Sequence, residues 1–157
     1  MTRLYGRAFD GQRLVDATPH GHWCMTTLLS AIRLEGVRAA VTVNSATDAE
    51  VFASYVQQAL VPDLRPGDIV VMDNLAPHKM PGIIAAIEAA GAEVWFLPPY
   101  SPDLNPIEKM WSKIKAYLRK VKARTEEALH AAITAAFATI TESDLINWFA
   151  SCGYIQP

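Results

Sequence analysis

The chain has 157 residues, of which 51% are hydrophobic and 19% are charged, a composition that is typical of one globular domain and not of a disordered chain. Its formal net charge of −2 gives no overall attraction to nucleic acid, so DNA binding would require a local basic patch. No apolar run is long enough to cross a membrane. Cys24 and Cys152 form no CxxC motif and are expected to be reduced thiols. These features predict a single cytoplasmic domain.

Two hairpins are predicted in the first 44 residues. Asp10-Gly11 is a turn signal between two short strand-like arms, and Thr26–Leu34 and Val37–Asn44 are β-rich runs joined at Glu35-Gly36. Three arginines on the first hairpin form either a solvated face or a contact with DNA phosphates: Arg3, Arg7 and Arg13. A zinc site is not favoured here, because two histidines alone (His20 and His22) are a poor ligand set.

A helix and a buried strand are predicted next. Thr47–Glu50 is a predicted capping box at the start of an amphipathic helix that ends near Pro62. Ile69–Met72 is a continuous apolar run, as expected for a strand buried on both faces. Asp73 ends that run. Because open α/β sheets bind ligands outside the carboxyl ends of their strands, Asp73 is a candidate site residue.

A second candidate acid follows the next predicted strand, Val94–Leu97. Four prolines then interrupt regular structure, and Asn105 is the predicted N-cap of a helix whose first residue is Pro106. Glu108 therefore lies on the first turn of that helix. The other predicted helices are Pro81–Ala90, stopped by Gly91, a helical region capped by Thr125, and a short helix over Leu145–Ala150.

The helix from Pro106 to about Ala123 combines an apolar stripe with charged residues that, after Glu108, are all positive. The stripe comprises Ile107, Met110, Trp111, Ile114, Tyr117, Leu118 and Val121. Four cations lie on one flank of the stripe (Lys109, Lys113, Lys120 and Arg124), and three lie on the flank of Glu108 (Lys115, Arg119 and Lys122). No acid occurs between Glu108 and Glu126. A nucleic acid backbone along the helix accounts for this better than a solvated face, which stays the alternative.

Each candidate side chain also has a structural interpretation that the residues alone leave open. Glu108 fits the third position of a capping box, favoured by the helix dipole. Asp73 fits a turn residue, and His78 fits a loop histidine bonded to backbone.

Two segments, MDNLAPHK and FLPPYSPDLNPIEKMWSKIK, resemble the catalytic domain of bacterial insertion-sequence transposases, the DDE enzymes related to the mariner group. The spacing agrees with that group, since 34 residues lie between Asp73 and Glu108. The resemblance extends over nearly the whole chain, from RLYGRAFDGQRL near the N-terminus to a terminal CGY.

The resemblance implies an α/β fold of the ribonuclease H-like type, with a mixed sheet flanked by helices, and metal-dependent DNA strand cleavage and strand transfer. In such enzymes three carboxylates hold two Mg²⁺ (or Mn²⁺) ions. Asp73 matches the second acid and Glu108 the third, and His78 lies in the matched segment as a further catalytic candidate. The implied partner is DNA, of transposon ends and target, and the residues expected to contact it are Lys109, Lys113, Lys115, Arg119 and Lys122.

The first acid of the family, on the first and central strand of its sheet, has no match in this chain. In related sequences it precedes the segment that matches Arg3–Ala8, and Asp10, Asp16 and Asp48 do not lie at the expected position. Residues 1–157 are therefore expected to be one N-terminally truncated catalytic domain that lacks this strand, is marginally stable and is inactive alone. An upstream-frame transposase fragment and further copies of the chain are the expected protein partners, and association with the nucleoid is expected on DNA binding.

Two other functions are compatible with parts of the sequence. A non-catalytic remnant or regulator that binds DNA or transposase would use the same basic helix. A receiver-like or phosphatase-like α/β domain would use Asp73 at a strand end, but it gives no role to the LPPYSPDLNPIE stretch.

Overall fold

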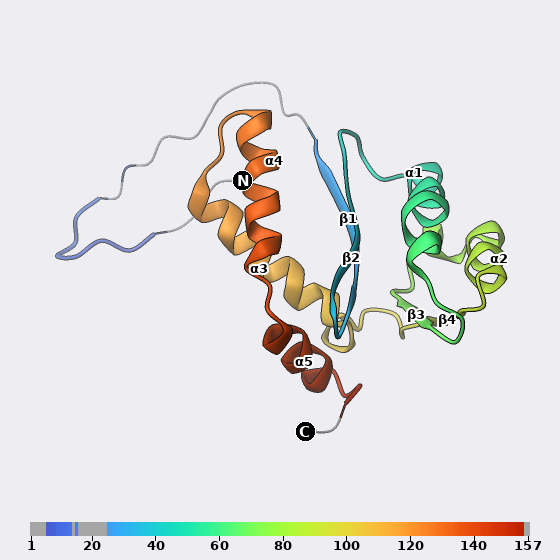
Figure 1. Cartoon of the computed structure of the whole chain (residues 1–157). Coiled ribbons are helices and arrows are strands. Elements are labelled where there is room, and N and C mark those ends of the chain that lie inside the picture. Colours follow the sequence, from blue (N-terminus) through green and yellow to red (C-terminus); the bar gives the residue numbers. More distant parts are fainter. Residues whose placement is uncertain (1–5, 14, 16–24, 156–157) are drawn as a thin grey trace.

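The computed structural model describes residues 6–13, 15 and 25–155, which form a mixed α/β arrangement (Figure 1). The strands are β1 (Thr27–Arg33), β2 (Gly36–Val43), β3 (Ile69–Met72) and β4 (Glu93–Phe96). The α-helices are α1 (Ala49–Tyr55), α2 (Pro81–Ala89), α3 (Pro106–Val121), α4 (Glu126–Ala138) and α5 (Glu142–Ser151). Short helical segments are η1 (Val56–Leu60), η2 (Val61–Asp63), η3 (Ala76–Lys79) and η4 (Pro102–Leu104). No described helix is long and apolar enough to cross a membrane.

The predicted hairpin of β1 and β2 is confirmed. The two strands pair antiparallel, with Arg33 opposite Gly36 at the turn and Thr27 opposite Val43 at the open end. A bulge interrupts the register between Leu29 and Ala31. Ala39, opposite this break, has a left-handed φ of 47°, which accommodates the extra residue.

The hairpin lies between two hydrophobic cores, as its position in Figure 1 indicates. Successive strand residues point to opposite faces, so Leu29 packs with α1, η1 and α2, whereas Leu28 and Ile32 pack with α3 and α4. The second core is built around the predicted apolar stripe of α3, whose Met110 and Ile114 are fully buried. The buried stripe of α3 therefore fixes the position of this helix against the hairpin.

The strands β3 and β4 form a separate parallel pair. Ile69 lies opposite Glu93 and Met72 opposite Phe96, and α2 makes the crossover between the strands. The sequence predicted one mixed sheet. In the described residues the strands instead form two two-stranded sheets, one antiparallel and one parallel.

The expectation that Ile69–Met72 is buried on both faces is wrong for one face, and the neighbouring strand β4 is also exposed on one side. Ile69 is 48% exposed and Trp95 is 55% exposed. Val70, Met72, Val94 and Phe96 pack on the core of α1, η1 and α2, but the opposite face of β3 and β4 opens onto a groove. An apolar run in the sequence indicates that a strand is buried. Whether one or both of its faces are buried depends on which helices and strands pack against it.

Two helix starts differ from the prediction. Asp48, not Thr47, is the N-cap of α1, and its carboxylate accepts hydrogen bonds from the backbone N–H groups of Glu50 (3.0 Å) and Val51 (2.9 Å). The predicted capping box is therefore absent there. A capping box occurs instead at the start of α5, between Thr141 and Asp144, and this helix begins three residues earlier than predicted.

A partly buried ion pair joins the two sheets. Arg33, at the end of β1, donates to Asp68 just before β3 at 3.1 and 2.6 Å, and to the carbonyl oxygen of Asp63 at 2.8 Å. Burial by itself raises the pKa of Asp68, but the backbone N–H of Arg65 and the Arg33 guanidinium outweigh it and hold that pKa below its ordinary value. The Asp68 carboxylate is thus ionised at neutral pH and holds the two sheets together at one end.

The predicted N-terminal hairpin is observed in part. Asp10 and Gly11 have left-handed φ angles of 57° and 68°, and the Gln12 N–H donates to the Phe9 carbonyl at 3.3 Å, which forms the turn. The described residues on either side of it are not in strands. The predictions for Arg3, Asp16, His20, His22 and Cys24 lie outside the described residues.

We predict that Gly91→Ala destabilises the fold. Gly91 has a φ of 82°, and an added Cβ would lie 3.2 Å from the Cα of Pro66. A left-handed residue with a side chain costs about 1–2 kcal/mol, and the backbone contact adds to this. Chemical denaturation should therefore show a loss of about 1–2 kcal/mol or more in the free energy of unfolding.

The matched control is Gly82→Ala, on the first turns of α2. A Cβ at Gly82 meets nothing within 4 Å, and alanine in a helix is favoured over glycine by roughly 0.5–1 kcal/mol. The control should be neutral or stabilising. Equal effects of the two substitutions would contradict the proposed close approach of Gly91 to Pro66.

Candidate active site

Asp73 lies at the carboxyl end of β3, where the strand gives way to the loop before η3. Its Oδ1 atom accepts a hydrogen bond from the backbone N–H of Leu75 at 3.2 Å, which makes a local turn. The Nδ1 atom of His78 lies 2.6 Å from the same oxygen. That contact is short but poorly aligned for a hydrogen bond. The side chain of Asp73 is 43% exposed, so a ligand can reach its carboxylate group.

His78 is held in place from behind. Its ring packs in a tilted arrangement against the ring of Phe52 in α1, with centroids 4.2 Å apart and an angle of 36° between the planes. Phe52 belongs to the buried core. Packing on Phe52 therefore fixes the His78 ring beside the carboxylate of Asp73. This contact is consistent with the prediction that His78 belongs to the site.

Glu108 lies on the first turn of α3, which begins as predicted with Asn105 as N-cap and Pro106 as first residue. Asn105 makes no capping hydrogen bond through its side chain, so the capping-box interpretation of Glu108 lacks one of its two bonds. The Glu108 side chain is exposed. The positive end of the helix dipole favours its charge without occupying its oxygens.

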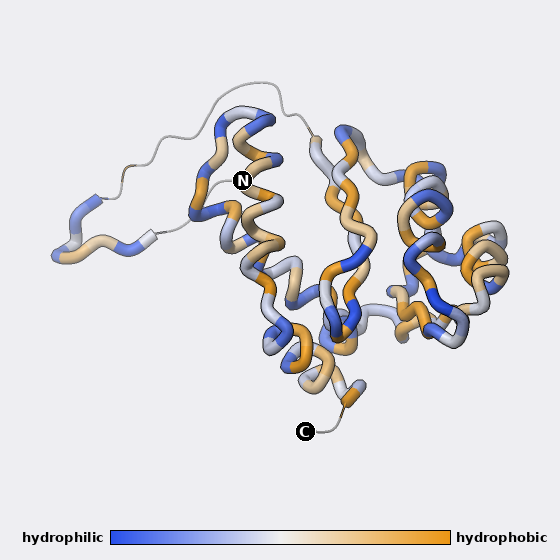
Figure 2. The backbone as a smooth tube through the Cα atoms, viewed as in Figure 1, coloured by the Kyte–Doolittle hydropathy of each residue, from blue (hydrophilic) through white to orange (hydrophobic). Residues whose placement is uncertain are grey.

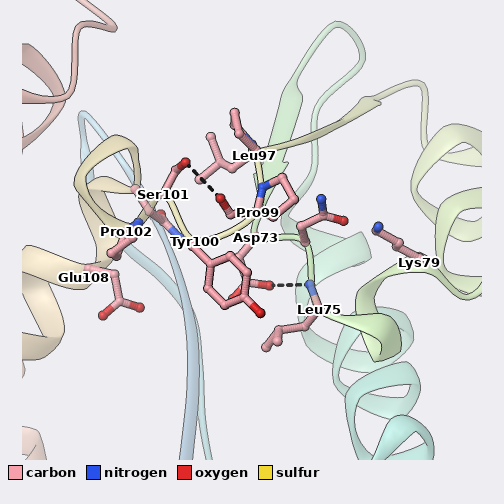
Figure 3. Close-up of a pocket in the computed structure, with 12 residues that line it drawn as sticks. Asp73, Leu75, Lys79, Leu97, Pro99, Tyr100, Ser101, Pro102 and Glu108 are labelled. Atoms are coloured by element: carbon pink, nitrogen blue, oxygen red, sulfur yellow. Dashed lines mark hydrogen bonds between the residues drawn. The ribbon is translucent and has the colours of Figure 1, made fainter.

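One cavity of about 450 Å³ brings Asp73 and Glu108 together (Figure 3). The loop from Leu97 to Pro102 forms its wall between β4 and α3. The residues that line the cavity are Asp73, Asn74, Leu75, Lys79, Leu97, Pro98, Pro99, Tyr100, Ser101, Pro102, Asn105 and Glu108. The chain thus places its two candidate acids, from a strand end and a helix start, on one concave surface.

The two acids offer the ligand type that hard divalent cations prefer. Carboxylate oxygens suit Mg²⁺ and Mn²⁺, and both acids line the cavity. Among the described residues there is no group of three His, Cys, Asp or Glu side chains that could hold a metal ion. The donor chemistry therefore fits such a cation, while the number of acids is one short of the three that the resemblance implies.

The cations of α3 divide into two kinds. Lys115 and Arg119, on the flank of Glu108, are exposed, and Lys122 is the left-handed C-cap of the helix. Figure 2 shows hydrophilic segments where α3 passes into α4. Lys113 is engaged within the fold, because its Nζ donates to the Thr139 carbonyl at 2.8 Å and to Asp144 at 2.6 Å. The structure favours a role for Lys113 in holding α5 over a role in DNA binding.

Two cavity residues were not singled out from the sequence. Lys79 follows His78, and its Nζ lies 6.0 Å from the centroid of the Phe96 ring. Tyr100 projects from the proline-rich loop and is fully exposed. A bulky aromatic residue between prolines in a predicted loop is the signal that could have identified Tyr100.

Comparison with known families gives a match to the DDE superfamily endonuclease model over residues 1–130. No curated protein is significantly similar to the chain. Among solved structures, the chain is similar to the Mos1 strand transfer complex (TM-score 0.75, 19% identity), the Mos1 transposase paired-end complex with left transposon end (0.73, 18%) and a pre-cleavage Mos1 transpososome (0.75, 17%). Each similarity covers 96% of this chain and 47%, 47% and 48% of those chains, respectively. The chain thus spans about half the length of the solved proteins that it matches.

We predict that Lys113→Met raises the pKa of Asp144. The hydrogen bond from Lys113, followed by the backbone and side chain of Thr141, lowers the pKa of Asp144 from 3.8 to about 2. The folded-state pKa is depressed, so the stabilisation is present above about pH 4 and is lost as the pH falls toward 2. In Lys113→Met this acid-dependent loss should shrink, and the stability at neutral pH should fall by less than about 1 kcal/mol.

The pKa of Asp144 is measurable by NMR titration of its carboxyl carbon. Lys109→Met, on the same flank of α3 without a hydrogen bond to Asp144, is the control. An unchanged Asp144 titration in Lys113→Met would show that Lys113 is free in solution and available to other partners.

Proposed function

We propose a function for this chain from its family, because the chain belongs to the DDE superfamily of endonucleases. Its fold resembles that of the Mos1 mariner transposase. We infer that the chain is part of the catalytic domain of a transposase that cleaves DNA strands and joins them to a target. The observation that carries this proposal is the shared cavity of Asp73 and Glu108, two acids with 34 residues between them in the sequence.

In this proposal the two acids hold a divalent cation, Mg²⁺ or Mn²⁺, on the cavity surface. A cation bound there supplies charge stabilisation to a phosphodiester and lowers the pKa of the attacking oxygen. Asp73 is oriented by the Leu75 N–H and braced by His78. Glu108 is positioned by α3, whose buried stripe fixes the helix against the hairpin.

The basic flank of α3 gives the DNA a path to these acids. Lys115 and Arg119 are exposed and lie on the flank that Glu108 heads, and Lys122 continues it at the helix end. Their charges favour phosphates along the helix. Lys109 lies on the opposite flank and is a further candidate. We therefore place a DNA backbone along α3, with one phosphate at the acid cavity.

The structure also supports the proposal that one strand of the family fold is missing here. A groove of about 500 Å³ is lined by consecutive residues of β1, from Leu28 to Arg33, and of β3, from Ile69 to Met72. In the described residues β1 pairs only with β2, and β3 only with β4. Among the described residues, the facing edges thus have no strand partner, and one extended segment would satisfy their backbone groups. Such a segment, laid parallel to β3, would end beside Asp73, where a third acid is needed.

We propose from this that the chain is inactive alone. The domain would then be completed by an upstream transposase fragment that supplies the strand and its acid. Assembly with further copies on DNA belongs to the same proposal, as do the transposon ends and target as substrates.

A second candidate function is a non-catalytic one, in which the chain binds DNA or transposase as a regulator. The exposed cations of α3 favour it equally, because DNA binding requires no complete metal site. The receiver-like alternative receives no support from the family match.

We predict that Arg119→Glu weakens DNA binding more than Lys120→Glu. The two residues are adjacent and both exposed, but they lie on opposite flanks of α3. Arg119→Glu should reduce affinity several-fold at low salt and lower the slope of log affinity against log salt by about 1. Fluorescence anisotropy with a labelled duplex at several salt concentrations measures both. Equal effects of the two substitutions would contradict the path along the Glu108 flank.

We also predict that the purified chain does not nick supercoiled plasmid in Mg²⁺ or Mn²⁺ above the level of its Asp73→Asn variant. The reason is that two acids leave the metal site incomplete. Nicking by the wild type that Asp73→Asn abolishes would contradict inactivity while supporting the endonuclease function. If the wild type binds DNA without nicking it, and the Asp73→Asn variant binds DNA equally well, the regulatory candidate is favoured.

A further inference from the structure

The loop between β4 and α3 presents a bulky ring in an unusual way. Tyr100 is fully exposed, and its backbone has a left-handed φ of 56°. Such a conformation is disfavoured for residues with a large side chain and is ordinarily taken by Gly, Asn or Asp. The exposed ring gains little packing that could offset this. Folding alone therefore favours glycine over tyrosine at this position.

The backbone on both sides of Tyr100 is held firmly. Pro98 and Pro99 restrict the chain before it, and the Ser101 hydroxyl donates to the Pro99 carbonyl at 3.4 Å. After it, the Leu104 N–H donates to the Ser101 carbonyl at 3.2 Å and closes η4. The ring thus projects from an anchored loop, so little conformational entropy is lost when a ligand packs on it.

The surroundings of the ring identify a ligand chemistry. Figure 3 shows the Tyr100 ring at the acid cavity, in view between Glu108 and Leu75. Prolines and Leu97 give the cavity an apolar wall, and Lys79 adds a cation. An aromatic face beside a cation and a pair of acids suits a nucleotide, whose flat base stacks on rings and whose phosphate is anionic.

We propose that Tyr100 is a stacking platform for an unpaired nucleobase next to the phosphate that lies at Asp73 and Glu108. This rests on the proposed endonuclease function and extends it. The base must be unpaired and unstacked, because both faces of a base inside a duplex are covered by its neighbours. Lys79 contacts a flanking phosphate. Stacking of this kind tolerates any base, so Tyr100 selects a strand distortion at the site instead of a sequence.

The test compares two labelled oligonucleotides of twelve residues, one of thymidine and one of abasic deoxyribose phosphate, by fluorescence anisotropy in Mg²⁺. Their backbones are the same, so the ratio of their affinities reports contacts to bases. The wild type should bind the thymidine oligomer about 10-fold more tightly than the abasic one. Tyr100→Ala should remove most of this ratio and leave the affinity for the abasic oligomer unchanged. Tyr100→Phe, which keeps the ring, should retain the ratio.

Phe9→Ala is the matched control, since Phe9 is also an exposed aromatic residue but lines neither the acid cavity nor the groove along β3, which Asp73 and Glu108 also line. Its affinity ratio should equal that of the wild type. Denaturation of Tyr100→Ala and Tyr100→Gly should show no loss of stability, which separates a binding effect from misfolding.

An unchanged ratio in Tyr100→Ala overturns the proposal. If Tyr100→Ala alters only the oligomeric state, measured by light scattering, the ring serves a protein contact and the proposal is also wrong. If neither oligomer binds to the wild type, the DNA path along α3 fails and the stacking proposal fails with it. Binding to both oligomers with equal affinity leaves the DNA path intact and removes the stacking platform alone.

Discussion

The parallel pairing of β3 with β4 is the constraint on which the candidate site depends. The Leu97 N–H donates to the Met72 carbonyl at 2.8 Å, so the chain leaves both strands at the same edge of the sheet. Asp73 is the next residue on one strand, and the proline-rich loop to Glu108 begins on the other. At the opposite end the Gly67 N–H donates to the Gly91 carbonyl at 2.8 Å, which sets the register. Two acids distant in sequence thus reach one cavity through a few backbone hydrogen bonds.

The hairpin of β1 and β2 separates two cores, and this division explains why the chain folds around a groove. Helix α3 buries its stripe on one face of the hairpin, while α1, η1 and α2 bury β3 and β4 on the other side. At one end of the groove, the ion pair of Arg33 with Asp68 ties β1 to the chain just before β3. The core of α1, η1 and α2 positions Asp73, and the core of α3 and α4 positions Glu108. The groove between the two cores is largely apolar. We propose that one strand added along this groove would supply both stability and a third acid.

Local structure near the site follows from the sequence because its signals are short in range. The four residues from Asn105 to Glu108 are enough to predict the start of α3, because Asn105 and Pro106 mark its N-cap and first position. This also places Glu108 on the first turn. The burial of Ile69 and Trp95 could not be predicted in this way, since it depends on which helices cover the sheet. The partner of Lys113 lies 31 residues away, in α5, and no periodicity signals such a contact. The sequence therefore predicts the elements and acids of the site, whereas the grooves and ion pairs around it require the tertiary fold.

The most direct test of the account is whether Asp73 and Glu108 bind one divalent cation. Mn²⁺ added to the ¹⁵N-labelled chain broadens the amide signals nearest to it. We expect broadening at Asn74 and Leu75 together with Glu108, lost in Asp73→Asn and in Glu108→Gln. It should persist in Asp103→Asn, because Asp103 lies in the same loop region outside the cavity. Broadening that is spread over all surface acids, or that survives both substitutions at the site, would contradict a shared metal site.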